Sequence, residues 1–416
     1  MNNVVVTGYG AITPIGNSIL EFSKNLYNGA SGASTISRFD TTKFATKFAC
    51  EVKNYTPTDF FEQKEVRKYD LFTQYALVAT KEAIEFAGLN DISKIDKHRI
   101  GVIAASGVGG IATFQEEMYQ YWQHQQPRYF SPYFVTKMIV NNIAGHISMI
   151  YGFNGLNFAV ASACSSSAHG IISAVQNIQL NKADVIIVTG SEAPIHEAGI
   201  GSFSAMRALS TNNQEPTLAS RPFDTQRDGF VLGEGAACLI LESEAHALKR
   251  NAKILAKIDG YAMNADAYHI AKPMPNGEMI AYNIAKCLDD ANVQISEIDC
   301  VNAHATSTPQ GDLAEISALN TVFGDTLKNI NITATKSMTG HLLGAAGIME
   351  SVASILTIEK QEVPPTINLK NRDEAIAKEI NLTENIAQKR DVNYVLNNNF
   401  GFGGHNVSIL FKKYNV

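Results

Sequence analysis

The chain has 416 residues, of which 45% are hydrophobic and 18% charged, and its formal net charge is -6 at pH 7. This length can bury one large core or two fused domains. The negative charge argues against a nucleic-acid partner, because a phosphate backbone requires a dominant basic surface. No stretch approaches the ~20 apolar residues of a membrane-spanning helix, and the first residues lack a basic leader. We therefore expect a cytoplasmic protein without membrane insertion.

The cysteines are scattered along the chain and include no C-x-x-C pair. They are Cys50, Cys164, Cys238, Cys287 and Cys300. A disulfide framework or a zinc site normally shows paired or regularly spaced cysteines. We therefore expect reduced thiols and no bound metal.

Strand-like and helix-like segments alternate through both halves of the chain. In the first half we expect strands at 3–9 (turning at Gly8 and Gly10), 99–105, 156–161, 183–190 and within 229–242, with helices at 69–87 and from 165 onward. After a short charged helix at 245–250, we expect strands at 254–260, 298–303, 330–334 and 408–411 and helices at 311–323 and 344–358. This alternation predicts an α/β protein of two pseudo-repeated halves, 1–250 and 251–416, with layered, parallel-rich sheets.

Cys164 lies where the predicted buried strand 156–161 meets the helix that follows it. The side chains of Ser165, Ser166 and Ser167 can cap the first helical turn. Free backbone amides and the positive end of the helix dipole would favour the thiolate and lower the pKa of the cysteine. A free cysteine is also commonly a small buried hydrophobe, and a serine run commonly only caps a helix. This stretch alone leaves both interpretations open.

Three loops in the second half carry further candidate residues. The loop 302–309 holds His304 among hydroxyl side chains at the end of a predicted strand, where α/β proteins place ligands. The loop 335–344 holds Lys336 and His341 and precedes the helix that carries Glu350. The loop 399–405 has enough glycine for close approach to a ligand, but it enters a strand and so does not match a dinucleotide motif. Turn formation or helix capping would explain each loop alone; together with the cysteine they suit thioester chemistry through a carbanion.

Six ordered motifs resemble the β-ketoacyl-acyl carrier protein synthases of the thiolase superfamily, most closely the bacterial type II elongating enzymes. They lie at 4–16, 161–167, 221–235 (RPFDTQRDGFVLGEG), 302–312, 335–347 and 398–406. The resemblance implies a thiolase-like five-layered α/β fold of two similar halves, usually a homodimer, with a Cys-His-His site. It also implies an acyltransferase that condenses malonyl-acyl carrier protein with an enzyme-bound acyl thioester in fatty-acid elongation.

The resemblance assigns roles to individual residues. Cys164 would hold the acyl group, while His304 and His341 would hydrogen-bond the malonyl thioester carbonyl and stabilise the enolate that forms as CO2 leaves. Backbone amides of Cys164 and Phe402 would bind the oxyanion, and Phe402 would also close over the acyl pocket. Lys336 and Glu350 would form a buried ion pair near the site.

The resemblance also implies how substrates and partners bind. Thr306 and Thr308 match contacts to the phosphopantetheine arm, which the acyl carrier protein supplies, so no cofactor is expected to be bound. Val108 matches the pocket floor, and Phe400 is expected to contact substrate. The acidic carrier protein would dock on a local basic patch made of Lys64, Arg67, Lys68, Arg128 and Arg207.

Some residues depart from the pattern of the fatty-acid enzymes. The run Ser162-Ala163-Cys164-Ser165-Ser166 replaces the common T-A-C-A-T and is closer to the A-C-S-S-S of polyketide ketosynthases. Ala305 replaces a usual glycine, and Leu156 a common proline. The same reaction in a polyketide or polyene pathway is therefore an alternative. A degradative thiolase would need a second cysteine in its C-terminal loop, and a non-catalytic chain-length partner would normally lack the nucleophile.

Overall fold

A ten-stranded mixed sheet forms the centre of the fold in this computed structural model, which describes residues 2–90 and 95–415. Its strand order is β10-β9-β13-β14-β8-β1-β7-β6-β4-β5. The first half of the chain supplies β1 (Val4–Ile12), β4 (Ile100–Ala105), β5 (Asn157–Val160), β6 (Val185–Glu192) and β7 (Gly235–Ser243). The second half supplies β8 (Ala256–Ala265), β9 (Cys300–Asn302), β10 (Asn331–Thr333), β13 (Tyr394–Gly401) and β14 (His405–Lys412).

The two halves share one topology. When the strands of this sheet are numbered separately within each half, both halves follow the order 3-2-4-5-1 from the outer edge to the middle. They meet where β1 pairs antiparallel with β8. The predicted division after residue 250 falls between α9 (Glu244–Lys249) and β8, and it remains a proposal.

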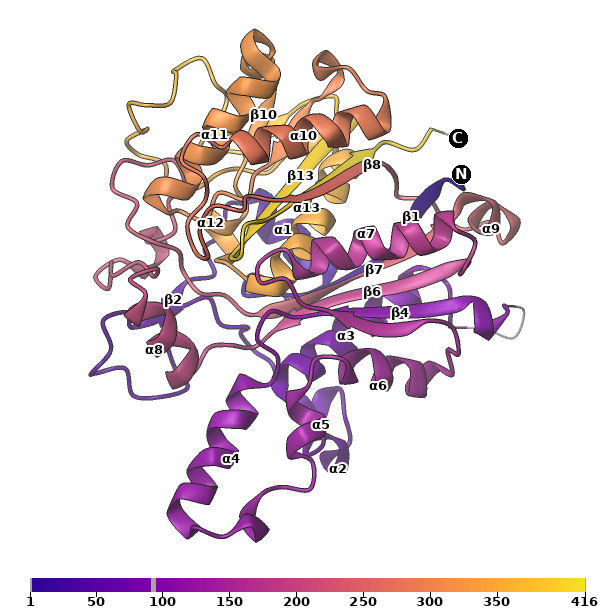
Figure 1. Cartoon of the computed structure of the whole chain (residues 1–416), viewed down its shortest axis with the longest axis vertical. Helices are drawn as coiled ribbons and strands as arrows, with labels where there is room; N and C mark the ends of the chain where they lie inside the picture. Colours follow the sequence, from indigo (N-terminus) through magenta and orange to yellow (C-terminus); the bar gives the residue numbers. More distant parts are fainter. Residues whose placement is uncertain (1, 91–94, 416) are drawn as a thin grey trace.

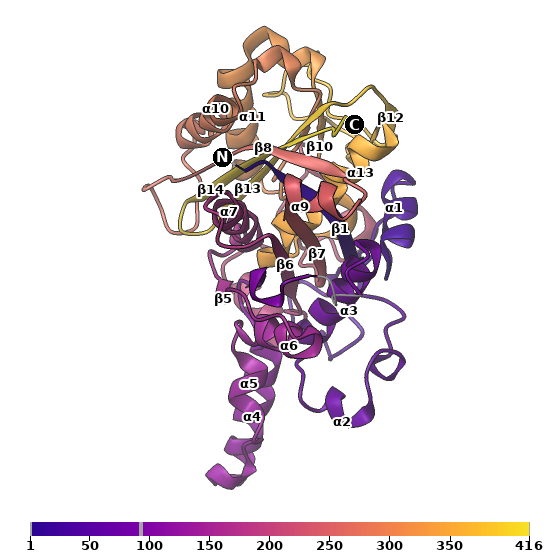
Figure 2. The same ribbon diagram turned by 90° about the vertical axis from the view of Figure 1, so that its right-hand side faces the viewer.

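Helices form three layers, one outside each half of the sheet and one between the two halves (Figures 1 and 2). The outer face of the first half is covered by α3 (Leu71–Phe86) and α6 (Asn142–Tyr151), and that of the second half by α10 (Glu278–Ala291) and α11 (Pro309–Phe323). Between the halves lie α7 (Ser166–Gln179) and α13 (Ala346–Lys360).

Side chains of β6 show how the layers arise from the sequence. Ile186 and Val188 belong to the inner hydrophobic cluster that contains residues of α7 and α13. Val185 and Ile187 belong to the outer cluster that contains residues of α3. Successive strand residues point to opposite faces, so a continuous apolar run buries both faces of the sheet.

The structure corrects two expectations about the strands. β1 does not turn at Gly8 and Gly10: an added Cβ at Gly10 would lie 2.0 Å from the carbonyl oxygen of Ala79 in α3. Glycine is therefore needed for close strand–helix packing. The sheet is also not parallel-rich, because β1, β7, β8 and β14 pair antiparallel with their neighbours and parallel pairs occur only toward the two outer edges.

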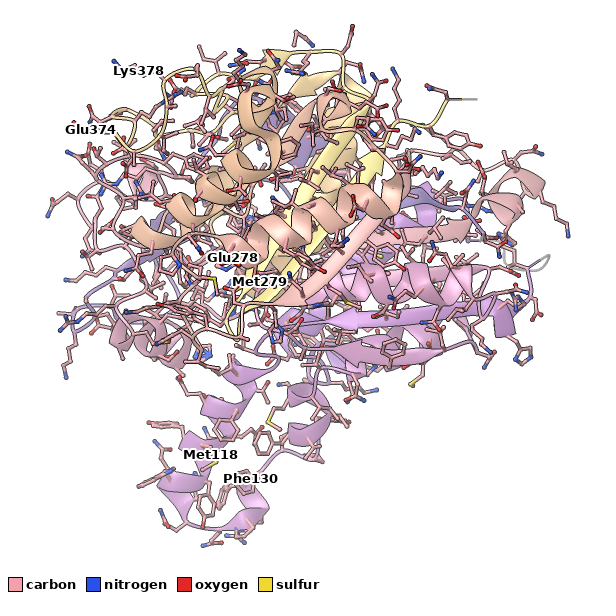
Figure 3. The ribbon with its side chains drawn as sticks, turned by 45° about the horizontal axis from the view of Figure 1, so that its top comes forward. Met118, Phe130, Glu278, Met279, Glu374 and Lys378 are labelled. Atoms are coloured by element: carbon pink, nitrogen blue, oxygen red, sulfur yellow. The ribbon has the colours of Figure 1, made fainter. Side chains whose placement is uncertain are left out.

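The edge strand and a projecting arm were not anticipated in this form. β5 was expected to be buried, but it lies at the edge of the sheet, where Asn157 and Phe158 are exposed. The arm, residues 111–138, contains α4 (Ile111–His124) and α5 (Phe134–Met138) and projects from the body in all three views (Figures 1–3). Figure 3 labels Phe130 on it, whose ring stacks on that of Tyr121 with centroids 5.3 Å apart.

Shorter elements complete the described chain. They are α1 (Ile19–Tyr27), α2 (Gln63–Val66), α8 (Glu197–Ala205), α12 (Lys336–Thr339), β2 (Ser34–Thr35), β3 (Phe48–Ala49), β11 (Glu362–Val363) and β12 (Gln388–Lys389). The 3-10 helices are η1 (Pro57–Asp59), η2 (Lys97–Arg99), η3 (Pro127–Tyr129), η4 (Pro216–Leu218), η5 (Ile295–Glu297), η6 (Gly324–Asn329) and η7 (Leu343–Ala345). Within residues 2–90 and 95–415, no helix has the length and apolar character needed to cross a membrane.

Candidate active site

Residues 161–165 join β5 to α7 and carry Cys164, as predicted; we call them the nucleophile turn because Cys164 is the proposed nucleophile. The hydroxyl of Ser166 accepts a hydrogen bond from the Ser162 backbone N–H at 2.8 Å and donates to the Ala163 carbonyl at 2.7 Å. Ala163 has φ 50, a conformation that costs a non-glycine residue about 1 to 3 kcal/mol and persists only when its surroundings hold it. Ser166 therefore fixes the backbone that presents the thiol.

Two expectations about this turn are wrong. Burial raises the pKa of the Cys164 thiol to about 12, even though the charge of Lys336 and the backbone N–H of Phe402 lower it. The desolvation of a thiolate outweighs these two contributions, so the resting group is a thiol. Ser165 occupies the N-cap position of α7 but makes no side-chain capping bond. Because the resting group is a thiol, a nearby base must take its proton when the sulfur attacks.

His341 is placed to act as that base. Its Nε2 lies 3.0 Å from the Cys164 Sγ, and its backbone N–H donates to the Val231 carbonyl at 2.8 Å. Burial, reinforced by the charge of Lys336, holds the pKa of His341 well below its ordinary value, so the ring is neutral. Its Nδ1 has no hydrogen-bond partner among the described residues. Either ring nitrogen can therefore carry the proton.

His304 is held in one tautomer. Its Nδ1 lies 3.3 Å from the Lys336 Nζ, and an ammonium group can only donate, so Nε2 carries the ring proton. Burial, together with the charge of Lys336, lowers the pKa of His304 well below its ordinary value. Its ring centroid is 5.4 Å from that of His341, with the two rings nearly perpendicular. The carboxylate of Glu315 fixes the loop by accepting the backbone N–H of His304 at 3.0 Å.

A buried ionic chain supports His304 from behind. Lys336 donates to Glu350, and the other carboxylate oxygen of Glu350 accepts the side-chain amide of Asn399 at 2.6 Å. Glu350 faces inward from α13, where the sequence left its direction open. An ion pair in the interior is retained only when further hydrogen bonds satisfy its partners, and Asn399 supplies one.

The predicted site residues from distant parts of the chain converge on one cavity of about 330 Å³. Those that line it are Cys164, Arg207, His304, Thr306, Thr308, His341, Phe400 and Phe402. The backbone N–H of Phe402 faces the Cys164 thiol and lowers its pKa, and the ring of Phe400 lies 5.6 Å from that of His304. The cavity therefore presents a thiol, two neutral imidazoles and a backbone donor to one ligand.

Other predicted residues lie elsewhere. Among the described residues, the cavity lining does not include Val108, which is 37% exposed, and its role as pocket floor stays a prediction. Lys64 lies on α2, and Arg67 and Lys68 follow directly after it. Arg128 lies on the arm. None of these four lines the cavity either, and the exposed Lys64 pairs with Glu62 at 2.7 Å.

Two buried carboxylates were missed at the sequence level. Glu192, at the end of β6, accepts the backbone N–H groups of Gly107 and Gly344 and so joins the turn after β4 to the loop of His341. Glu315 has the role described above. Acidic residues are normally read as surface residues, and only their distant backbone partners reveal their function. The described residues contain no group of three or more His, Cys, Asp or Glu side chains arranged to hold a metal ion.

Comparison with known proteins identifies the family. Residues 1–247 match the family model described as "Beta-ketoacyl synthase, N-terminal domain", and residues 255–370 match "Beta-ketoacyl synthase, C-terminal domain". The chain belongs to the β-ketoacyl synthase family. The 3-oxoacyl-[acyl-carrier-protein] synthase 2 of Coxiella burnetii is 41% identical to this synthase, with 99% of this chain and 98% of the relative covered.

Solved ketosynthase structures superpose closely on this synthase. The ishigamide ketosynthase/chain length factor covers 100% of both chains with a TM-score of 0.92 and 31% identity. The ketosynthase of the AntDE:AntF complex, a type II polyketide system solved with its acyl-carrier protein, covers 100% of both chains with a TM-score of 0.91 and 32% identity. The predicted thiolase-like fold and the family resemblance are both confirmed.

Proposed function

We propose that this synthase condenses malonyl-acyl carrier protein with an acyl group held on Cys164, with loss of CO2, in fatty-acid elongation. The observation that carries the proposal is the convergence of Cys164, His304 and His341 on one cavity beside the backbone N–H of Phe402. The Coxiella burnetii relative is a 3-oxoacyl-[acyl-carrier-protein] synthase 2, which supports the substrate class.

In the first half-reaction the acyl group moves to the enzyme. As the Cys164 sulfur attacks the acyl thioester, its proton passes to His341 Nε2, 3.0 Å away. Backbone N–H groups of Cys164 and Phe402 bind the oxyanion of the tetrahedral intermediate. The intermediate collapses by breaking the bond to the phosphopantetheine sulfur, which takes the proton back from His341. The products are acyl-Cys164 and the free carrier thiol.

In the second half-reaction the malonyl group loses CO2. The Nε2–H of His304 donates to the malonyl thioester oxygen, and the bonding electrons of the departing carboxylate form an enolate. The Nδ1 of His341 has no hydrogen-bond partner among the described residues, so the ring can carry its proton on Nε2. In that tautomer His341 is a second donor to the thioester oxygen. The carbanion then attacks acyl-Cys164, a carbon–carbon bond forms, and the bond to the cysteine sulfur breaks; a solvent proton restores the thiol.

The carrier protein would deliver its phosphopantetheine arm through the cavity mouth. Thr306 and Thr308 line the cavity, and their hydroxyls are 3.1 Å apart. Arg207 lines it too, which supports a role in docking the acidic carrier. The remaining docking residues proposed here are Lys64, Arg67, Lys68 and Arg128. The free cysteines, all buried, are what a reducing cytoplasm allows.

The second copy of a homodimer would cover the face formed by β5 and the arm. Phe158 is exposed on the edge strand, and Tyr119 and Trp122 are 55% and 69% exposed on the arm. An unpaired strand edge beside exposed aromatic side chains is a surface that a partner normally covers.

The test of the proposed reaction uses the Cys164→Ala variant. With malonyl-acyl carrier protein it should still release CO2, because His304 and His341 remain, but it should form neither acyl-enzyme nor β-ketoacyl product. Acyl-enzyme and β-ketoacyl-carrier protein are both measured by intact-protein mass spectrometry. Cys300→Ala, which changes a buried cysteine of β9 outside the cavity lining, is the matched control and should retain both activities. Condensation by Cys164→Ala at the wild-type rate would refute the assignment.

A polyketide or polyene pathway is the second candidate. The serine run after Cys164 favours it, and the AntDE:AntF complex is a type II PKS ketosynthase bound to a hexaketide. Mass spectrometry of the acyl group on Cys164 from cells distinguishes the two. Saturated chains support fatty-acid elongation, whereas polyketone or conjugated polyene chains support the alternative.

A further inference from the structure

The side chain of Ser165 connects the nucleophile turn to the strands on either side of the glycine loop, residues 400–404. Ser165 is fully buried, and its Oγ lies 2.9 Å from the His405 carbonyl oxygen and 3.2 Å from that of Asn399. These two residues flank the glycine loop, at the end of β13 and the start of β14. One hydroxyl therefore contacts both sides of the loop's base from the position next to Cys164.

The neighbouring serines have different partners. Ser166 fixes the nucleophile turn itself, as described above, and Ser167 accepts the backbone N–H of Ile348 in α13 at 2.9 Å. Ser165 makes no capping bond in its own helix. Within the serine run, the hydrogen bonds to the strands flanking the glycine loop thus come from Ser165.

The position of the glycine loop determines where a key donor points. The backbone N–H of Phe402 in this loop faces the Cys164 thiol and lowers its pKa. Gly401 packs so tightly against the turn that an added Cβ would lie 3.2 Å from the Cys164 nitrogen and 3.1 Å from the Ser165 Oγ. Gly403 and Gly404 have φ of 90 and 75, where glycine has conformational freedom that other residues lack. A loop of this composition needs fixed ends if its central N–H is to stay aligned.

We propose that Ser165 is a positioning residue that aligns the Phe402 N–H for acyl transfer to Cys164. Its hydroxyl has a single hydrogen and donates to the His405 or the Asn399 carbonyl, so either flank of the loop can be bonded to the nucleophile turn. Ser165 does not line the cavity, and it therefore acts through Phe402 and not on the substrate. The inference rests on the proposed condensation and names one determinant of its first half-reaction.

The two half-reactions should depend on Ser165 unequally. Acyl transfer uses the Phe402 N–H, whereas decarboxylation uses His304 and His341, whose hydrogen bonds described above come from other residues. The side-chain amide of Asn399 also keeps its hydrogen bond to the Glu350 carboxylate when the Ser165 hydroxyl is lost. A typical net contribution for one intramolecular hydrogen bond corresponds to about a 3- to 10-fold change in rate.

The experiment compares Ser165→Ala with Ser191→Ala, a matched control. Ser191 is also fully buried, and its hydroxyl donates to the Phe72 carbonyl at 2.6 Å, outside the cavity lining. For each preparation, the single-turnover rate of Cys164 acylation by acyl-carrier protein is measured beside CO2 release from malonyl-carrier protein. The ratio of the two rates does not depend on how much of the sample is folded.

We expect this ratio to fall about 3- to 10-fold in Ser165→Ala and to stay at the wild-type value in Ser191→Ala. Equal losses of both activities, or an unchanged ratio, would overturn the role of Ser165. Failure of the wild-type protein to acylate Cys164 at all would instead refute the proposed condensation, so the two failures are distinguishable.

Discussion

Lys336→Met removes an ammonium group that serves two buried partners. The first partner is Glu350, and without Lys336 this carboxylate remains in the interior with only the Asn399 amide as a described donor. Breaking a buried ion pair by removing one member costs about 3 to 5 kcal/mol of folding stability. The second partner is Nδ1 of His304, 3.3 Å away, whose bond to Lys336 fixes the Nε2–H donor. A bond to a charged group contributes about 1.5 to 3 kcal/mol, which predicts roughly a ten- to hundredfold loss of decarboxylation.

The double variant Lys336→Met/Glu350→Gln separates these two effects. Glutamine removes the uncompensated charge and keeps an oxygen that can accept the Asn399 amide. Urea unfolding should therefore show that the double variant recovers most of the stability lost by the single variant. CO2 release from malonyl-carrier protein should stay as low as in the single variant, because His304 still lacks its Nδ1 donor. Recovery of decarboxylation in the double variant, or wild-type stability of the single variant, would refute the reasoning.

Burial raises the pKa of Glu192 from 4.5 to about 7. Between these two pH values the folded state keeps a proton that the unfolded state has lost, so the stability of the fold falls as pH rises through this range. Glu192→Gln should flatten this fall, on the order of 2 kcal/mol, in urea titrations between pH 5 and 8; parallel wild-type and variant curves would contradict this. Gly10→Ala should lower stability by about 1 to 3 kcal/mol because its Cβ would meet Ala79 in α3, whereas Gly145→Ala, with no atom within 4 Å, should be nearly neutral in thermal unfolding. Phe158→Asp should convert a dimer to a monomer in sedimentation velocity experiments, and an unchanged dimer would exclude the β5 edge from the interface.

The sequence predicted the identities of the central residues because each lies in a short motif at the end of a strand. Cys164, His304 and His341 were found in this way, and the structure brings all three to one cavity. Their protonation states were harder to predict. The thiol was expected to have a lowered pKa, but burial raises it to about 12. Desolvation depends on segments far away in the chain, which a local motif does not describe.

The role of each serine could not be predicted for a related reason. A serine run before a helix is typical of capping, and that interpretation uses only local geometry. In the structure, the partners of Ser165 lie 234 and 240 residues away in β13 and β14. β13 itself was not anticipated from the sequence, so one of the two strands that contact Ser165 was absent from the predicted fold.

The repeated topology explains how residues so distant in the sequence meet. Cys164 follows β5, the third strand of the first half, and the Lys336–His341 loop follows β10, the third strand of the second half. The long helices that follow these segments, α7 and α13, pack against each other between the two halves of the sheet (Figure 1). Equivalent strand-to-helix connections therefore approach each other across the pseudo-repeat, which places Cys164 in contact with His341 across 177 residues. A single half could supply the thiol or the imidazoles, but Cys164 and His341 come together only when both halves pack.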